Sequence, residues 1–429
     1  MKPLEGITVL DFSQFLSGPS ATLRLADLGA EVIKIERPGG DIARTMYVSD
    51  CKIGNDSTLF HAINRNKSGI SIDLKQKENL KKIEKLVQKA DVAVFNFRPG
   101  VAEKLGLSYE NLKEWNPRII YGKISGYGEK GPWKSKPGQD LLAQSLSGVT
   151  WLNGNAENAP TPLGLSLADM FAGQHLVQGI LAALIKREKT GEGVCISVNL
   201  MESILDIQFE MFTAYLNNGH KTPQRSRVNN ANAYIGAPYG IYETKEGYLA
   251  LAMASIVVLG RLLECKALEK YENPVEWATK RDEIKAILKE HLKTQTADYW
   301  LEILEANDIW CAKVMNWEEL FATEGFKTLD MIQTIRKDDE PVFETTRCPI
   351  RIDGIKYFCD RPAPEVGDPP AELPIIPILL GSRPYFSACD RTRRMVRCKS
   401  SQAVICLCKP LGRGVRYRSV TTVIPKSLR

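Results

Sequence analysis

Residues 7–36, ITVLDFSQFLSGPSATLRLADLGAEVIKIE, decide the fold that the sequence predicts for the first half of the chain. Residues 7–12 are a β-branched apolar run of strand length, residues 21–28 favour a helix that Gly29 ends, and residues 31–36 form a second apolar strand. Together they make a βαβ unit, the usual beginning of a parallel, doubly wound sheet. The turn after the first strand lacks the G-x-G-x-x-G pattern, which disfavours a dinucleotide-dependent oxidoreductase.

Further alternation of strands and helices extends this unit into an α/β domain. We expect strands at 69–74, 91–97, 118–124 and 194–198. We expect helices at 75–90, 101–105, 140–147 and 201–216, and a long apolar helix that follows residues 163–173 and ends at about 188. An Asn-rich polar connection, 218–237, then leads to a second unit. This unit should contain a strand at 248–252 and several helices within 258–324, before a strand at 348–353 returns.

Four parts follow from this organisation. Residues 1–217 form a large Rossmann-like domain, 218–330 a smaller α+β domain with its linkers, 331–367 a segment that returns to the large domain, and 368–429 an atypical basic tail. The tail holds twelve Lys and Arg against three acidic residues, a net charge of +9, which leaves −3 for the rest of a chain whose total is +6. We therefore expect no nucleic-acid partner and a poorly ordered tail.

Targeting, membrane and metal signals are weak throughout. No apolar run reaches membrane-spanning length, and the first six residues carry neither a secretory signal nor a presequence. The ten cysteines, four of them in the tail, lack paired or zinc-type spacing, which is typical of reduced thiols in an intracellular compartment. We expect neither a membrane segment nor a metal site.

Cationic side chains follow several of the expected strands. Arg37, Lys75, Arg98 and Lys104 come at strand ends or in the next turns, where parallel sheets bind their ligands. Phosphates fit such a set, because turn N–H groups and Lys or Arg side chains both bind them. Their scatter favours a cofactor with separated phosphates, such as coenzyme A. Taken singly, each residue is more typical of a solvated surface.

The stretch LGLSLADMFAG, residues 163–173, places one acidic side chain among small and apolar neighbours where a long helix begins. Asp169, or Ser166 before it, most often caps the helix in such a place. A carboxylate kept ionised by the helix start, with room for a substrate, also suits chemistry. His175 points away from Asp169 on a helix, and no G-x-S-x-G elbow occurs. In an enzyme, a carboxylate acting directly as nucleophile or base is the simplest hypothesis.

In combination, these stretches resemble the class III CoA transferases, a family that includes formyl-CoA and carnitine CoA transferases and the α-methylacyl-CoA racemases. The resemblance implies a Rossmann-like large domain and a smaller domain, in two chains threaded through one another as an interlocked homodimer. Within the family, the chain is most similar to the mitochondrial transferases that act on succinate and hydroxymethylglutarate. The matching pieces run from residue 4 to about 366 and include 4–11, 18–19, 28–36, 64–68, 96–100, 125–128 and Asp169.

The resemblance also implies a reaction and a set of site residues. Asp169 is the implied covalent nucleophile, and CoA thioesters are substrates, so no tightly bound cofactor is expected. CoA would move from a dicarboxylyl-CoA such as succinyl-CoA to a dicarboxylic acid of the glutarate or hydroxymethylglutarate type. The implied compartment is the mitochondrion, or otherwise the cytoplasm. The residues implied to contact CoA are Phe15, Leu16, Ser17, Arg37, Ile72, Lys75, Asn96, Phe97 and Lys104, and the strand-end argument adds Arg98.

Two departures from the family pattern leave alternatives open. Gln139 stands where the racemases have a His base, so an acyl-CoA racemase or isomerase would lack half of its machinery. After Gly367 the chain continues as DPP in place of the family's Gly-Glu-His-Thr ending. The changed ending makes an inactive CoA-binding variant a further alternative, because it puts dimer packing in doubt.

Overall fold

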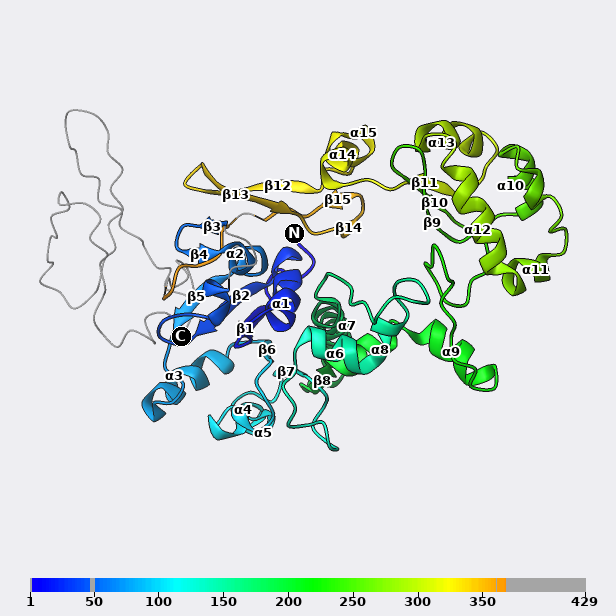
Figure 1. Cartoon of the computed structure of the whole chain (residues 1–429). Coiled ribbons are helices and arrows are strands. Elements are labelled where there is room, and N and C mark those ends of the chain that lie inside the picture. Colours follow the sequence, from blue (N-terminus) through cyan, green and yellow to red (C-terminus); the bar gives the residue numbers. More distant parts are fainter. Residues whose placement is uncertain (1, 47–50, 360, 368–429) are drawn as a thin grey trace, which may run out of the picture. The chain divides into compact units, whose positions relative to one another are not determined.

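A six-stranded parallel sheet is the centre of the first domain. The computed structural model describes residues 2–46, 51–359 and 361–367. The strand order is β5-β2-β1-β6-β7-β8, so the chain builds one half of the sheet outward from β1 and then the other half from β6 (Figure 1). All five strand pairs are parallel, which confirms the predicted α/β class. The strands are β1 (Thr8–Asp11), β2 (Glu31–Glu36), β5 (Ser68–Ser71), β6 (Val92–Phe95), β7 (Ile120–Ser125) and β8 (Cys195–Asn199).

Helices cover both faces of this sheet, and each face has its own apolar core. Val9, Val32 and Val94 face the core shared with α1 and α7, whereas Leu10 and Ile33 face the one shared with α3 and α5. This alternation is what a strand buried on both faces requires. The helices of this domain are α1 (Ser17–Asp27), α2 (Thr58–Asn64), α3 (Lys77–Val87), α4 (Val101–Lys104), α5 (Tyr109–Trp115), α6 (Asp140–Ser147), α7 (Leu167–Thr190), α8 (Leu200–Asp206) and α9 (Phe209–Asn217).

Two helix boundaries differ from the sequence prediction. α1 begins at Ser17 rather than at residue 21, because Pro19 needs no N–H partner in the first turn and extends the helix backward. The single helix expected over 201–216 was wrong. It is broken at Gln208, whose side-chain amide donates to the Ile204 carbonyl at 2.9 Å while its own backbone leaves helical geometry.

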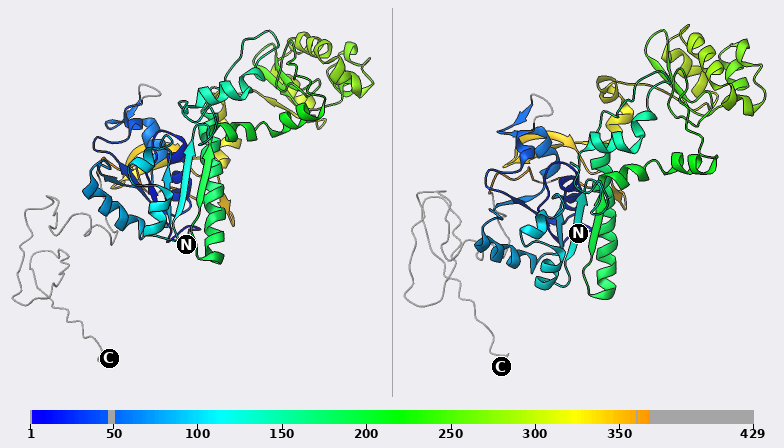
Figure 2. Two further views of the ribbon diagram at one scale, coloured as in Figure 1. Left: turned by 90° about the horizontal axis from the view of Figure 1, so that it is seen from below. Right: turned by 60° about the horizontal axis from the view of Figure 1, so that its bottom comes forward.

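Within the described chain, α7 is the one helix that is long and apolar enough to cross a membrane. Figure 2 shows it lying along the sheet in both views, and it contacts β7, β8 and α1. Leu176, Ile180 and Ala183 on this helix are buried in the core of the large domain. The length and apolar composition of α7 are therefore those of a core helix that packs on a sheet.

The second domain has a separate core around a small antiparallel sheet. Its strands are in the order β11-β10-β9, and Tyr242 and Leu249 are completely buried beneath the helices. The expected strand at 248–252 is present, but β9 and β11 were not predicted, because strands of three or four residues leave little periodicity. The elements are β9 (Gly240–Glu243), β10 (Tyr248–Leu251), α10 (Ile256–Leu262), α11 (Pro274–Thr279), α12 (Arg281–Leu292), α13 (Ala297–Glu305) and β11 (Cys311–Lys313).

The chain then passes through two short helices and two hairpins. The strand expected at 348–353 is one arm of the second hairpin and does not join the large sheet. Beyond it, Arg361 pairs with Glu31 of β2 at 3.2 Å, and its carbonyl accepts from the Asn66 N–H. The predicted tail, 368–429, lies outside the described residues. The elements are α14 (Trp317–Ala322), α15 (Glu324–Leu329), β12 (Ile332–Lys337), β13 (Glu340–Thr346), β14 (Arg351–Ile352) and β15 (Ile355–Lys356).

Short elements complete the description. They are the hairpin strands β3 (Lys52–Ile53) and β4 (Asp56–Ser57) and the 3-10 turns η1 (Ile42–Thr45), η2 (Val149–Trp151) and η3 (Lys266–Leu268).

Candidate active site

Asp169 lies in the first turn of α7, but another residue caps that helix. Within the described chain, the Ser166 side chain makes no capping hydrogen bond. Asp140, at the start of α6, accepts instead from the N–H groups of Ala168 at 2.7 Å and Asp169 at 3.3 Å. The capping role considered for Ser166 or Asp169 is thus carried out by Asp140. The Asp169 carboxylate is left for other contacts.

Gln144, one helical turn after Asp140, fixes the loop that precedes α7. Its amide nitrogen donates to Asp140 Oδ2 at 2.7 Å and to the Leu165 carbonyl at 3.0 Å. Its amide oxygen accepts from the Leu163 N–H at 3.0 Å. The buried Asp140–Gln144 pair therefore positions both the loop and the helix start that carry the nucleophile candidate.

Close packing of α1 on α7 brings Ser17 to the same carboxylate. Gly173 is one turn after Asp169, and a Cβ there would lie 2.6 Å from Ser20 Oγ and 2.8 Å from the Ser17 carbonyl. Only glycine lets the two helices approach this closely. One turn back along α7, the Ser17 side chain faces the Asp169 carboxylate and acts to lower its pKa.

The environment of Asp169 raises its pKa to about 6. Burial is the main cause and the Asp140 carboxylate is the second, while the Ser17 side chain acts in the opposite direction. The expectation that the helix start favours the ionised form was wrong in its sign. The free N–H groups at the start of the helix donate to Asp140, so their dipoles stabilise the Asp140 carboxylate rather than that of Asp169. At neutral pH the group is still mostly ionised, in a range suited to a nucleophile.

The turn after β1 and the end of β6 meet at the point where the strand order reverses. The Gln14 N–H donates to Asn96 Oδ1 at 2.8 Å, and the Asn96 amide donates back to the Gln14 carbonyl at 2.5 Å. Phe15 is 45% exposed in this turn. Ligands of doubly wound sheets bind at such a switch point. The structure therefore places Phe15, Leu16, Ser17, Asn96 and Phe97 in one region.

The other predicted CoA residues lie on neighbouring strand ends with different exposure. Arg37 follows β2 and Lys75 follows β5, and both are exposed at the same sheet edge. Arg98 and Lys104 are exposed after β6 and at the end of α4. The Ile72 side chain is 6% exposed and belongs to the core, so that residue offers a ligand mainly its backbone.

A loop of small and polar residues connects β7 to α6. Gly126 and Gly138 close its base: a Cβ on either would lie 2.5–2.6 Å from the Cα of the other. Gln139 then leads into Asp140. The loop between β7 and α6 thus ends immediately before the residue that caps α7.

Histidine and metal chemistry find little support in the described ranges. His175 lies between Ser203 Oγ at 3.0 Å and Asp206 Oδ2 at 3.2 Å, yet Ser203 is only 2% exposed and cannot reach a substrate. In residues 2–46, 51–359 and 361–367, no group of three His, Cys, Asp or Glu side chains forms a metal site.

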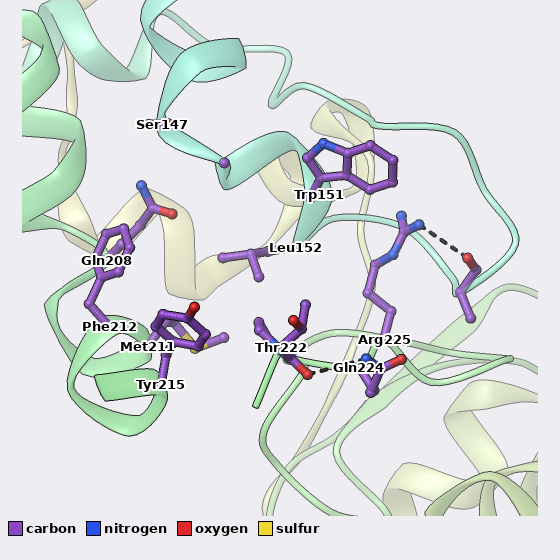
Figure 3. Close-up of a pocket in the computed structure, with 13 residues that line it drawn as sticks. Ser147, Trp151, Leu152, Gln208, Met211, Phe212, Tyr215, Thr222, Gln224 and Arg225 are labelled. Carbon is purple, nitrogen blue, oxygen red and sulfur yellow. Dashed lines mark hydrogen bonds between the residues drawn. The ribbon is translucent and has the colours of Figure 1, made fainter. Parts of the chain in front are cut away.

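A cavity of about 440 Å³ lies at the other end of α6 (Figure 3). Trp151, Leu152, Phe212 and Tyr215 give it a largely apolar lining. At its rim, the Arg225 guanidinium donates to the carbonyls of Asn153, Ala156 and Asn158. Three of its N–H donors are thus engaged by backbone carbonyls, and the side chains named above leave the cavity lining largely apolar.

Sequence reasoning missed Asp140, Gln144 and Gly173 as parts of the site. Asp140 and Gln144 share one face of a helix that was predicted, but nothing local shows that they reach a segment 28 residues away. Gly173 inside a helical pattern was the available signal, since such a glycine often marks close packing.

Comparison with known proteins agrees with this geometry. The model of CoA-transferase family III matches residues 4–369. The human succinyl-CoA:glutarate CoA-transferase is 34% identical over 75% of this chain and 74% of its own length. The succinate–glutarate CoA-transferase of Agrobacterium fabrum is 31% identical over 86% of this chain and 94% of its own.

Solved structures show the same fold. A CAIB/BAIF family protein from Brucella suis superposes with a TM-score of 0.74 at 29% identity, covering 86% of this chain and 97% of its own. The family model extends over the sheet, α7 and the second domain. With its parallel sheet, its switch-point turn and Asp169 at the start of α7, this chain belongs to CoA-transferase family III and transfers CoA between carboxylic acids.

Proposed function

We propose that the enzyme moves CoA from a dicarboxylyl-CoA such as succinyl-CoA to a dicarboxylic acid of the glutarate or hydroxymethylglutarate type, with Asp169 as covalent nucleophile. The observation that carries the proposal is the Asp169 carboxylate itself. Asp140 caps the helix, so the Asp169 carboxylate is available, and it faces Ser17 at the end of the turn that follows β1. The names of the human and Agrobacterium relatives support the choice of acids.

The first half-reaction converts the donor thioester into an aspartyl thioester by two successive acyl exchanges. An Asp169 carboxylate oxygen attacks the thioester carbonyl carbon, and the C–S bond breaks. CoA leaves as a thiolate, and a mixed anhydride between Asp169 and the donor acid remains. The thiolate then attacks the Asp169 carbonyl of that anhydride, which releases the donor acid as a carboxylate and leaves an aspartyl-CoA thioester. No proton is gained or lost, because a carboxylate enters and a carboxylate leaves.

The second half-reaction repeats these steps with the acceptor. Its carboxylate attacks the aspartyl thioester to give a new anhydride and CoA thiolate, and the thiolate attacks the acceptor carbonyl. The product thioester leaves and the Asp169 carboxylate is regenerated. One carboxylate therefore serves both directions, which agrees with the lack of a histidine partner near Asp169 in the described structure.

CoA would lie along the carboxyl edge of the sheet. Phe15, Leu16, Ser17, Asn96 and Phe97 would line the switch point, and Ile72 follows the edge strand β5, which β2 separates from β1. The exposed cations Arg37, Lys75, Arg98 and Lys104 supply charge for the phosphates.

Mass spectrometry tests the covalent step. The protein is incubated with succinyl-CoA and hydroxylamine, digested, and searched for a hydroxamate. We expect the modification on Asp169 alone, and its loss in Asp169→Asn. A protein that turns over but stays unmodified at Asp169 contradicts the mechanism. The same incubation in deuterated water separates an isomerase, which exchanges the α-proton without an acceptor acid.

A homodimer is part of the proposal, because large apolar side chains flank the cavity. Leu141, Leu142 and Leu146 of α6 are 42–48% exposed, and Trp151, Phe209 and Leu216 are 59–69% exposed. Apolar patches of this kind usually mark an interface. A second copy of the chain would cover them.

Light scattering after size-exclusion chromatography tests the dimer. The double variant Phe209→Glu/Leu216→Glu should be monomeric, whereas Val275→Glu, at a residue 65% exposed on α11, should not change the mass. A chain ending near Gly367, run beside the full chain, shows whether the atypical tail permits the dimer. The resemblance also supports a mitochondrial protein, which imaging of a tagged chain checks.

A further inference from the structure

Four charged side chains are buried beneath the turn that follows β1. Asp11, Lys34, Asp41 and Lys67 are each at most 4% exposed. Lys67 Nζ lies 3.0 Å from Asp11 Oδ2, and Lys34 Nζ lies 2.8 Å from Asp41 Oδ2. Burying two ion pairs costs several kcal/mol of desolvation for each ion, roughly what their attraction returns. Stability alone is therefore a weak reason for these charges.

The contacts of these charges converge on the turn. Asp11 Oδ1 accepts from the Ser13 N–H at 3.0 Å and from the Ser13 hydroxyl, and the Ser13 carbonyl accepts from Lys34 Nζ. At the other end, Lys67 Nζ donates to the Pro19 carbonyl at 2.9 Å. The network thus holds the chain at Ser13, where the turn begins, and at Pro19, inside the first turn of α1.

Lys67 and Thr22 hold Asp11 in place for this purpose. Thr22 Oγ1 donates to Asp11 Oδ2 at 2.7 Å, and Lys67 is itself oriented by Asn64 Oδ1 at 2.9 Å. Burial acts to raise the pKa of Asp11, but Lys67, Lys34 and the two hydroxyls outweigh it and lower the pKa to about 2. Asp11 is therefore ionised, and accepts hydrogen bonds, at any pH at which the enzyme is assayed.

The turn needs such restraint because its backbone is strained. Phe15 has φ of 60°, a left-handed backbone conformation that is uncommon and strained for an aromatic residue. Two residues later, Ser17 meets the Asp169 carboxylate. A turn released from Ser13 and Pro19 would relax toward negative φ at Phe15 and move the Ser17 hydroxyl.

We propose that Lys67, acting through Asp11, is a positioning residue that keeps the 13–17 turn in the geometry in which the Ser17 side chain faces the nucleophile Asp169. This inference rests on the proposed function of Asp169. It adds a lysine that never touches substrate, on a segment between α2 and β5. Because the Ser17 side chain acts to lower the pKa of Asp169, the ionisation of that carboxylate reports the position of the turn.

The experiment measures kcat against pH between 5 and 9 for the wild type, Ser17→Ala, Lys67→Met and the double variant. Losing the Ser17 hydroxyl should move the acidic limb of the kcat–pH profile to higher pH by about 0.5–1 unit. As a result, kcat at pH 6 should fall about two- to five-fold, while the plateau at pH 8 should change little. Lys67→Met should show the same shift and a raised KM for acyl-CoA. The double variant should shift no further than Ser17→Ala, because both act through one hydroxyl.

Lys285 provides a matched control. Its ammonium is completely buried in the second domain and donates to Ser226 Oγ at 3.2 Å and to the Asn229 carbonyl at 3.0 Å. Lys285→Met should lower stability without moving the acidic limb. If Lys67→Met does not fold, Thr22→Val removes one donor to Asp11 without uncovering a buried charge, and should shift the limb less but in the same direction.

Three results would overturn the inference: an unmoved limb in Lys67→Met and Thr22→Val, an equal shift in Lys285→Met, or shifts that add in the double variant. A wild type without transferase activity would refute the proposed function instead. In that case an infrared titration of the Asp169 carboxyl, taken as the difference from Asp169→Asn, still decides the inference. There Lys67→Met and Ser17→Ala must raise the Asp169 pKa together.

Discussion

Asp140→Asn should widen the pH range of the enzyme toward acid. Asp140 caps α7 and is the second cause, after burial, of the Asp169 pKa of about 6. The amide oxygen of Asn can still accept from the Ala168 N–H, so the cap survives while the negative charge is lost. Removing a nearby like charge lowers a carboxyl pKa by about one unit.

The size of the effect follows from the ionised fraction of Asp169. With a pKa of about 6, about a tenth of the carboxyl is ionised at pH 5, and with a pKa lower by about one unit about half would be. The kcat at pH 5 should therefore rise about five-fold in the variant, while the plateau above pH 7 should not rise.

The assay is the initial rate of transfer from succinyl-CoA to glutarate at saturating substrates from pH 4.5 to 8.5. Gln144→Met is the matched control, because it breaks contacts of the same loop without changing charge. Its acidic limb should stay at the wild-type position. An Asp140→Asn limb that is unmoved, or moved to higher pH, would refute the claim that Asp140 sets the nucleophile's pKa.

Three further predictions concern stability and binding. Asp169→Asn should abolish transfer yet raise the free energy of unfolding at pH 7 by about 1–3 kcal/mol. The reason is that a carboxyl with a raised pKa weakens the fold as the pH rises from about 4 through 6. Urea unfolding should show the gain in stability at pH 7 and not at pH 3.5. Gly173→Ala should lower that free energy by about 1–3 kcal/mol through contact with the Ser17 carbonyl, whereas Gly164→Ala, with open space around its Cβ position, should change the melting temperature little. Arg37→Ala and Lys104→Ala should each raise KM for the CoA thioester about five- to ten-fold with little change in kcat, and Lys81→Ala on α3 should leave KM unchanged; equal effects of all three would contradict a phosphate role.

The fold was largely predictable because its signals are local. The strands of the large sheet are apolar runs of the right length, and the βαβ unit at 7–36 carries its own turn and helix end. The misses have local causes too. Gln208 breaks a helix by competing for the Ile204 carbonyl, and β9 and β11 are too short for a periodic pattern.

The site was predictable in its members but not in its electrostatics. Asp169 was selected from its small neighbours and from the family resemblance, and the strand-end residues from the topology that the sequence implied. The sign of the Asp169 pKa shift was missed, because it depends on a carboxylate 29 residues away and on burial by α1. Neither can be derived from residues 163–173 taken alone.

The contact between Gly126 and Gly138 has a consequence for how the enzyme can diversify. Because the two backbones touch, residues 127–137 leave and rejoin the domain at a single point, and their length does not affect where Asp140 sits. Insertions, deletions or replacements in this segment are therefore compatible with an unchanged position of α6. A change in the length of this segment can thus leave Asp140 in place, provided that both glycines at the junction are kept.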